Sequence, residues 1–431
     1  MHLAVGVRTE RPAGTGGQMR QRMRGRDGAA WAIPAALGVD AVGSGLYLPL
    51  SMVYFLSATD LSEARVGLLM TAASACALLL PLLVGRVVDR IGPRPVVIAG
   101  QLLQAGGFLL YLAVDGPASL FAAALVESAG LRVYWSSVFA LIAEQGDDRA
   151  RDQWFARTAM IRAAGTGAGT VLAGLLLGLA SQNAYRGMIL ANALSFLLAA
   201  AALALFVRSR PRPAADGVAG KPADGVRHLL GNRAYLSLIG VNVLFNICTV
   251  LLAVATPVYV VRGLDAPGWA VGAFLTLTTA VVATSTAAVT RGIRRRTSRG
   301  GAMAWGGVAW AAWCGAIALA VLLPRGPVLV GYLALVMLLW AAAEMLHGPA
   351  SNALSADAAP QGARGTYLAA FQYSFAAADM VTPGLFGLLY GVERVLPWVV
   401  IGLLALVASA AIRPLERRLT AGRAAVGAAG A

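Results

Sequence analysis

The sequence predicts an all-α membrane protein with twelve transmembrane helices arranged as two six-helix halves. Its 431 residues are 58% hydrophobic and only 13% charged, whereas soluble domains carry about 25% charged residues. Apolar segments of transmembrane length recur along the chain, and most of the basic residues gather in alternate connections between them. These observations together indicate that the solvent around this chain is a lipid bilayer.

Each apolar segment is long enough to cross a membrane as a helix. About 20 residues at a rise of 1.5 Å per residue cover a hydrocarbon core of about 30 Å. Runs rich in Leu and Ala lack the alternation of barrel strands, so helices are the expected form. The predicted spans are residues 31–56, 66–84, 95–114, 117–143, 157–180, 187–207, 234–261, 269–289, 302–323, 328–347, 364–390 and 396–413.

The basic residues predict how these spans are oriented. Twelve spans place both termini on one side, and 29 of the 35 Lys and Arg residues lie on that side. Five lie on the other side, and Arg132 lies inside the fourth span. An excess of Lys and Arg marks cytoplasmic connections, so we expect a multi-pass protein of the cell membrane with both termini in the cytoplasm. The net charge of +15 then reflects orientation and anionic lipid, and nucleic acid is not an expected partner.

The longest polar connection divides the chain into two halves. It contains three prolines and Lys221, the only lysine. An internal repeat crosses it: Ala140–Ala143, followed by Arg151, matches the segment 353–356, followed by Arg364, at an offset of 213 residues. The predicted organisation is a disordered basic cytoplasmic tail (1–30), an N-terminal six-helix bundle (31–207), a cytoplasmic linker (208–233), a C-terminal six-helix bundle (234–413) and a cytoplasmic tail (414–431).

A short charged turn lies between the second and third spans. Its sequence is Gly85-Arg86-Val87-Val88-Asp89-Arg90-Ile91-Gly92-Pro93-Arg94. It resembles the loop between helices 2 and 3 of the major facilitator superfamily, with the pattern G-x-x-x-D-R-x-G-(R/K)-(R/K), and the resemblance extends over roughly residues 31–413. Pro93 and Pro95 around Arg94 depart from this pattern. The resemblance implies a transporter with a cytoplasmic latch formed by Gly85, Asp89, Arg90, Gly92 and Arg94, with Asp89 near Arg364 at the start of the eleventh helix.

The fifth span carries a pattern of small residues. Gly165, Gly169, Thr170 and Gly174 resemble the G-x-x-x-G-P-x-x-G-G signature of antiporter branches of the superfamily, with Thr170 at the proline position. The repeat places Pro383 and Gly387 of the eleventh span at the positions of Thr170 and Gly174. Such a face lets another helix approach closely and favours a bend. Ordinary small-residue packing is the alternative interpretation.

Five charged residues stand out inside predicted spans: Asp40, Glu127, Arg132, Glu344 and Asp379. Each is costly in a bilayer unless it is paired or hydrated, so each is a candidate functional residue. Arg132 is expected to face Asp40 or another carboxylate across a central cavity, because Glu127 lies about 140° around the same helix. Asp40 is the first candidate for a proton or cation site and Glu344 the second, with Asn242 and Asn246 as polar cavity residues. Ion pairs that only pack helices are the alternative.

The resemblance favours a secondary transporter that exports a small amphiphilic molecule in exchange for protons. The alternatives are an importer or facilitator of a small nutrient and, in another class, a non-transporting membrane receptor or an enzyme. An enzyme is not expected, because no nucleophile–base pair or phosphate-binding loop is visible. The scattered His residues and the isolated Cys76, Cys248 and Cys314 predict no metal site. The expected partners are the bilayer and a small-molecule cargo, the driving force is a proton gradient without a bound cofactor, and a monomer is expected.

Overall fold

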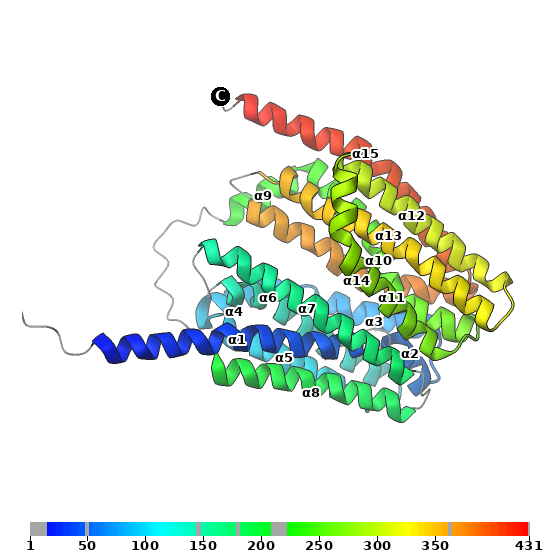
Figure 1. The fold of residues 1–431 in the computed structure, drawn as a ribbon, viewed down its shortest axis with the longest axis horizontal. Helices are drawn as coiled ribbons and strands as arrows, with labels where there is room; N and C mark the ends of the chain where they lie inside the picture. The colour runs from blue at the N-terminus through cyan, green and yellow to red at the C-terminus, as the bar shows by residue number, and fades with distance from the viewer. Residues whose placement is uncertain are drawn as a thin grey trace, which may run out of the picture.

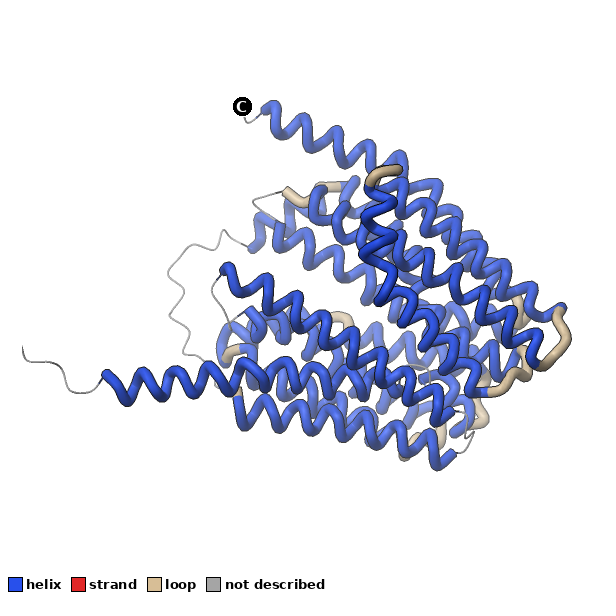
Figure 2. Tube along the Cα trace, viewed as in Figure 1, coloured by secondary structure: helices blue, strands red, loops and turns tan. Residues whose placement is uncertain are grey.

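The computed structural model describes residues 15–47, 51–143, 148–177, 182–207, 222–360 and 364–429. Within these ranges the regular secondary structure is helical and no strand occurs (Figure 2). The predicted tail residues 1–14 and the predicted linker residues 208–221 lie outside the described residues. The fold is therefore described by the packing of helices alone.

The N-terminal half holds the first six predicted spans. Two of these spans are made of two successive helices, and the other four are single helices (Figure 1). The helices are α1 (Thr15–Tyr47), α2 (Ser51–Ala58), α3 (Glu63–Ala77), α4 (Leu80–Ile91), α5 (Pro93–Tyr111), α6 (Pro117–Ala143), α7 (Asp148–Leu177) and α8 (Gln182–Phe206).

The C-terminal half holds the other six predicted spans, preceded by the short linker helix α9. Its elements are α9 (Pro222–Gly231), α10 (Arg233–Val258), the π-helix η1 (Tyr259–Gly263), α11 (Gly268–Arg294), α12 (Arg299–Leu319), the 3₁₀ turn η2 (Ala320–Leu322), α13 (Pro327–Ala358), α14 (Arg364–Val392) and α15 (Leu396–Ala429). Side-chain caps start several of them. Asn232 accepts a hydrogen bond from the backbone of Tyr235, and Ser298 accepts one from Gly301, which satisfies otherwise free amides of the first turn.

The predicted fold class is confirmed, because a helix or a pair of successive helices occupies each of the twelve predicted spans. By length and hydropathy, eight helices in the described ranges are suited to cross a membrane, and the bent pair Trp31–Tyr47 and Met52–Ala58 makes a ninth if it counts as one span. Three predicted spans remain. The second is broken between α3 and α4, the third (α5) contains two glutamines, and the fifth (α7) contains several arginines. Polar residues in these three spans therefore need partners inside the protein.

The predicted start of the first span differs from the structure. The sequence predicts a disordered tail up to residue 30, whereas α1 begins at Thr15 and runs without interruption into the bundle (Figure 1). Helix propagation costs little once a packed segment has provided the nucleus. The residues before Trp31, mostly Gln, Arg, Met and Gly, therefore continue the helix of the span.

The two halves contact each other mainly through two pairs of helices, α3 with α14 and α7 with α11. We call the end of the molecule with the connections 91–93, 294–299 and 358–364 the basic end. Figure 1 shows the halves meeting near α2 and α11, at the opposite end, and diverging toward the linker helix α9. At the opposite end Arg262 donates to Glu63 (3.4 Å) and to the carbonyl of Leu56 (2.6 Å) across the boundary. The described hydrogen bonds between the halves thus lie at the middle and at the opposite end of the molecule.

One side chain of the N-terminal half enters the backbone of α14. The hydroxyl of Thr71 donates to the carbonyl of Met380 (2.7 Å) and accepts from the amide of Gly384 (3.0 Å). In an uninterrupted helix the amide of Gly384 would bond directly to Met380, four residues before it. Gly67 and Gly387 permit this approach, because a Cβ on either would collide with the backbone of the facing helix. The joint between α3 and α14 therefore depends on Thr71 as well as on small residues.

We expect the variant Thr71→Val to weaken the closure of the opposite end. Valine keeps the β-branched shape but removes both hydrogen bonds, which contribute about 1 kcal/mol each. The population with the halves separated at this end should rise by roughly fivefold or more. Spin labels on Asp60 and Glu393, which lie in exposed loops of the two halves at this end, report the separation by electron–electron resonance.

The control is Thr71→Ser, which retains the hydroxyl and should leave the distance distribution near that of the native chain. A distribution for Thr71→Val that matches that of Thr71→Ser would show that the hydroxyl has no role in closure.

Candidate functional site

Three charged side chains from the two halves face each other between α6 and α14. Arg132 of α6 reaches across the boundary, and its Nη2 lies 3.5 Å from the carbonyl of Ala376 in α14. Its charge interacts with those of Glu127 on α6 and Asp379 on α14. Glu127 is half-buried and accepts a hydrogen bond from Ser128 (3.3 Å), whereas Asp379 is exposed although it lies in the middle of its helix. The carboxylate of Asp379 is therefore not enclosed by neighbouring side chains.

The charges of this trio are only weakly satisfied by the protein. No ion pair joins Arg132 to a carboxylate of the described residues. The Nε of Arg132 is buried without a hydrogen-bond partner, although a guanidinium carries five donors. If all three groups are ionised, two carboxylates and one guanidinium carry a net charge of −1. The site is therefore suited to a monovalent cation, to a proton, or to each in turn.

Asp40 is separate from this trio and has a different partner from the one expected. It is 2% exposed, and its Oδ2 lies 3.3 Å from Nη1 of Arg162 on α7. The same Nη1 donates to the hydroxyl of Tyr134 (3.2 Å), and the guanidinium lies 4.4 Å from the centroid of the Trp135 ring. Arg132 does not face Asp40. Its guanidinium instead reaches toward α14 of the other half.

The sequence held a signal for Arg162 that the charge pattern concealed. Arg162 lies inside the predicted span 157–180 but is not among the five charged residues that stand out in the spans. It shares a helix face with Gly165 and Gly169, at spacings of three and seven residues. Both glycines lie against the backbone of α1, near Gly38 and Val42 respectively. The face that brings α7 close to α1 therefore also directs Arg162 to Asp40.

The other residues of the small-residue pattern lie at two different helix contacts. Thr170 is buried, and its hydroxyl donates to the carbonyl of Thr166 in its own helix (2.8 Å). In α14, Pro383 and Gly387 occupy the positions that the repeat matches to Thr170 and Gly174. Both lie against α3 of the other half. Gly174 is part of α7, but its surroundings lie outside the described residues.

The polar candidates of the C-terminal half belong to the interior of that half. Asn242 and Asn246 are 0% and 1% exposed, so they do not line an open cavity as the sequence predicted. Asn242 Nδ2 donates to Ser374 (2.7 Å), and its Oδ1 lies 3.0 Å from Nε2 of His347. Asn246 also donates to Ser374 (3.4 Å). These bonds connect α10, α13 and α14, a role that sequence reasoning missed because His347 stands alone in the sequence.

Glu344 lies apart from this network. It is half-buried on α13, and its Oε2 accepts a hydrogen bond from Thr249 of α10 (3.0 Å). No ion pair involves it among the described residues.

The charged segment at residues 85–94, predicted as a turn, is helical except at Gly92, because α4 runs to Ile91 and α5 begins at Pro93. The segment is anchored within its own half. Gly92 has φ of +83° and ends α4, so a residue with a side chain would be strained there. Arg94 donates from Nε to the carbonyl of Leu203 (3.2 Å) and from Nη2 to that of Ala204, at the end of α8. A cation suits the carboxyl end of a helix. Gly85 and Arg90 are exposed, and the side chains of Asp89 and Arg364 lie outside the described residues.

The corresponding connection of the C-terminal half, at residues 291–299, is also anchored. Arg299 forms an ion pair with Asp357 and donates to the carbonyl of Ala353. Glu416 of α15 accepts from Ser298 (2.7 Å) and from the amide of Gly300 (2.8 Å), at the start of α12. A carboxylate suits the amino end of a helix. In each half a charged side chain at the basic end thus binds the end of another helix. Arg94 of α5 binds the carboxyl end of α8, and in the corresponding pair of helices Glu416 of α15 binds the amino end of α12.

The comparisons with known proteins agree with this fold. The family model of the Major Facilitator Superfamily matches residues 35–383. No match was found among curated protein sequences.

Several solved transporter structures share the fold at low sequence identity. An auto-inhibited POT family peptide transporter has 13% identity and a TM-score of 0.72, with 90% of this chain and 97% of that chain covered. The nucleoside transporter NupG has 12% identity and a TM-score of 0.69, with 91% and 98% covered. A bacterial homologue of the human lysosomal transporter Spinster, inward-facing and unoccupied, has 13% identity and a TM-score of 0.70, with 92% and 98% covered.

We expect Arg162→Met to destabilise the protein because it leaves the carboxylate of Asp40 buried without its partner. Breaking a buried ion pair costs about 3–5 kcal/mol. Because the side chain of Arg162 is 26% exposed, a smaller loss of about 2 kcal/mol is expected. Thermal unfolding in detergent, followed by intrinsic fluorescence, measures the loss.

Two comparisons identify the partner of Asp40 in this experiment. Asp40→Asn should recover most of the stability lost in Arg162→Met, whereas it should recover none of any loss caused by Arg132→Met. Recovery with Arg132→Met instead would contradict the pairing of Asp40 with Arg162.

Proposed function

Because the chain belongs to the major facilitator superfamily and is thus a secondary transporter, we propose that it exports a small amphiphilic cation in exchange for protons. One observation carries this proposal. Unpaired charges from both halves converge where the halves meet, with Glu127 and Arg132 on α6 and Asp379 on α14. A pair of carboxylates held near one guanidinium binds either a cation or a proton, and this competition is what an exchanger requires.

The exchange follows from the charge of the trio in its two loaded forms. A proton on Glu127 or Asp379 makes the trio neutral, which weakens its attraction for a cation. Loss of that proton restores the net charge of −1 and the attraction. A ligand shifts a conformational equilibrium only through its differential affinity for the two states. A trio whose members belong to different halves provides such a difference, since the distances between its charges change as the halves rock.

The aromatic and apolar surroundings support an amphiphilic cargo. Trp135 lies one helical turn from Arg132 on α6, and its ring already attracts one guanidinium, that of Arg162, at 4.4 Å. Aromatic rings attract organic cations through the negative face of the ring. Apolar residues surround the trio on α6 and α14.

We expect Asp379→Asn to abolish proton exchange while leaving the fold intact, because asparagine has nearly the same size but no titratable proton. The measurement is cargo-driven proton movement in proteoliposomes that contain the dye pyranine. The cargo panel should include the permanent cation ethidium, a zwitterionic amphiphile and a neutral amphiphile of similar size.

In this assay we expect ethidium to drive protons through the native chain and not through Asp379→Asn or Glu127→Gln. Glu393→Gln, in an exposed loop of the opposite end, is the matched control and should retain native exchange. Cargo flux that ignores the pH gradient in the native chain would refute proton coupling. In inside-out vesicles export moves cargo into the lumen, so net movement of cargo out of the lumen would refute export.

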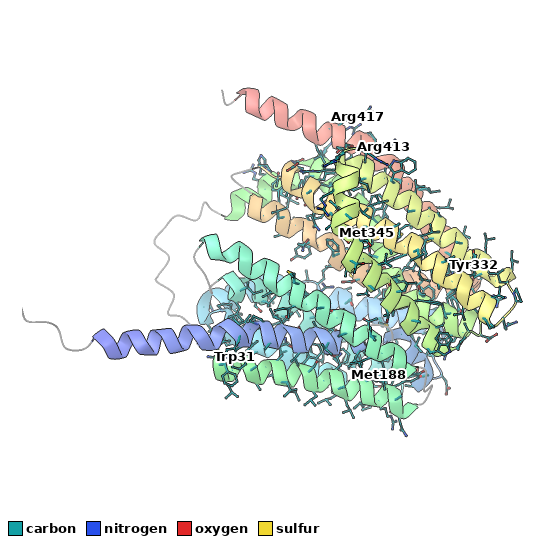
Figure 3. The ribbon with its side chains drawn as sticks, in the orientation of Figure 1. Trp31, Met188, Tyr332, Met345, Arg413 and Arg417 are labelled. Carbon is teal, nitrogen blue, oxygen red and sulfur yellow. The ribbon has the colours of Figure 1, made fainter. Side chains whose placement is uncertain are left out.

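We also propose that the basic end faces the cytoplasm of a cell with both termini on that side, and that the protein acts as a monomer. Figure 3 places Arg413 and Arg417 toward the C-terminal extension of α15, whereas Tyr332 lies near the other end of the molecule. The basic connections are attached to the same end of the bundles as the extensions of α1 and α15. An excess of Arg on one side is the property that orients helices during insertion.

This orientation predicts the labelling of single cysteines in intact cells. In a chain without its three native cysteines, Asp60→Cys and Glu393→Cys should react with an impermeant maleimide added outside. Arg90→Cys and Arg295→Cys, exposed at the basic end, should react only after the membrane is permeabilised. The reverse pattern would show that the basic end faces outward.

A further inference from the structure

The interior of the N-terminal half contains a row of polar side chains that the site between the halves does not use. On α1, Asp40, Ser44 and Tyr47 share one helix face, at spacings of four and seven residues. On α5, Gln101, Gln104 and Tyr111 share another, and they are 1%, 3% and 2% exposed. These two faces meet inside the half, where hydrocarbon side chains would be expected in a bilayer protein.

Contacts fix the order of this row from one end to the other. At one end, Asp40 lies beside Gln101, Tyr134 and Ser44, with the hydroxyl of Ser44 at 3.5 Å. At the other end, the ring of Tyr47 lies 5.6 Å from that of Tyr111, and Glu127 is close enough to both tyrosines for its charge to affect them.

The distance between the two ends of the row is the same along α1 and along α6, which run antiparallel. Asp40 and Tyr47 are seven residues apart on α1, as are Tyr134 and Glu127 on α6. Seven residues correspond to about 10 Å along a helix.

Gln104 lies between these ends. Its side chain packs against Gly130, one turn from Glu127 on α6, and Gly107 lies against the backbone of Glu127 itself. Gln101, one turn away on α5, continues the row to Asp40. A series of polar groups thus connects a carboxylate of the site between the halves with a carboxylate inside the N-terminal half. Glu127, Gln104, Gln101 and Asp40, together with Tyr47 and Ser44, are called the polar track.

Two atoms of the polar track have no protein partner. Gln101 Oε1 and Gln104 Nε2 are buried without a hydrogen bond to any described residue. A buried polar group left unsatisfied costs about 1–3 kcal/mol. Internal water is the usual partner of such groups and makes about three hydrogen bonds to them. The half-buried Glu127 and the 26% exposed side chain of Arg162 are routes by which water reaches the two ends.

We propose that the polar track binds a chain of water molecules that carries protons between Glu127 and Asp40. This inference rests on the proposed exchange of protons for cargo and adds a route through the N-terminal half. In the net step one O–H bond breaks at Glu127, which becomes a carboxylate, and one forms at Asp40, which becomes a carboxylic acid. Water relays the proton, because a glutamine amide positions a water but does not itself exchange a proton readily.

Transfer of the proton to Asp40 changes the ion pair between Asp40 and Arg162. When Asp40 accepts the proton it no longer neutralises Arg162, whose guanidinium is then held only by Tyr134 and the ring of Trp135. The proton thereby leaves the site between the halves without entering the space that the cargo occupies. Proton and cargo would use separate routes in the same conformation.

Radiolytic footprinting tests for the waters without any cargo. Hydroxyl radicals formed from bound water oxidise adjacent side chains even in a protein interior, and mass spectrometry locates the oxidation. In the full chain in nanodiscs we expect strong labelling of Tyr47 and Tyr111. The reference is Tyr235, which is 0% exposed but donates to the carbonyls of Ser355 (3.3 Å) and Tyr367 (3.0 Å). Labelling of Tyr47 and Tyr111 at or below the rate of Tyr235 would overturn the proposal.

The variant Gln104→Leu tests whether the track depends on its polar groups. It should lower the labelling of Tyr47 and Tyr111 several-fold, because an apolar side chain removes the ligand in the middle of the chain of waters. The control Thr278→Val, which also removes a buried polar group but lies on α11 and bonds only to its own helix, should leave that labelling unchanged. Unchanged labelling in Gln104→Leu would overturn the proposal.

Proton movement completes the experiment, with ethidium as the probe. In Gln104→Leu we expect ethidium-driven proton release to slow by about tenfold or more, as for the loss of a proton-transfer group, while ethidium binding measured by fluorescence stays native. Native proton release in this variant would overturn the relay. If the native chain moves no protons with any cargo, the proposed exchange fails, whereas the labelling of Tyr47 and Tyr111 still decides whether the waters are bound.

Discussion

The cost of a charge inside a bilayer governs the arrangement of this protein. A charged side chain at the centre of a membrane costs about 3 kcal/mol or more unless it finds a partner or water. Asp40 meets this requirement inside one half, with Arg162, Tyr134 and Ser44 around it. Glu127, Arg132 and Asp379 lie instead near the boundary between α6 and α14, without an ion pair among the described residues. The second solution leaves these groups available for a cargo, and the first does not.

The same constraint explains how the halves are joined. A helix in lipid has no hydrophobic force driving it toward another helix, so close packing and hydrogen bonds must hold the joint. At the opposite end, Gly67 and Gly387 allow α3 and α14 to touch, and Thr71 and Arg262 add polar contacts across the boundary. At the basic end Arg94, Arg299 and Glu416 bind within their own halves. Each half is thus a firm body, and the joint that can open and close is the one between them.

The sequence reasoning was accurate where a property depends on the local chain and less accurate where it depends on the rotation of a helix. Arg132 was expected to face Asp40 or another carboxylate across the cavity, whereas it reaches the carbonyl of Ala376 in the other half and Asp40 pairs with Arg162. Asn242 and Asn246 were expected in a cavity, yet they bind Ser374 and His347 inside the C-terminal half. Two residues one turn apart share a face, but nothing in the spacing states which neighbour that face meets. Gln101 and Gln104 passed unnoticed for the same reason.

The sequence by itself determined the all-helical membrane fold, the positions of the twelve spans along the chain and the separation of the basic residues between their connections. These follow from hydropathy and charge along the chain, because each span must satisfy its own backbone in lipid. Only the tertiary structure decided that Arg162 pairs with Asp40, that Asp379 and Glu127 share a site with Arg132, and that Thr71 enters the backbone of α14. Each of these contacts joins helices far apart in the sequence, and their partners are set by helix rotation and by the close approach that individual glycines permit.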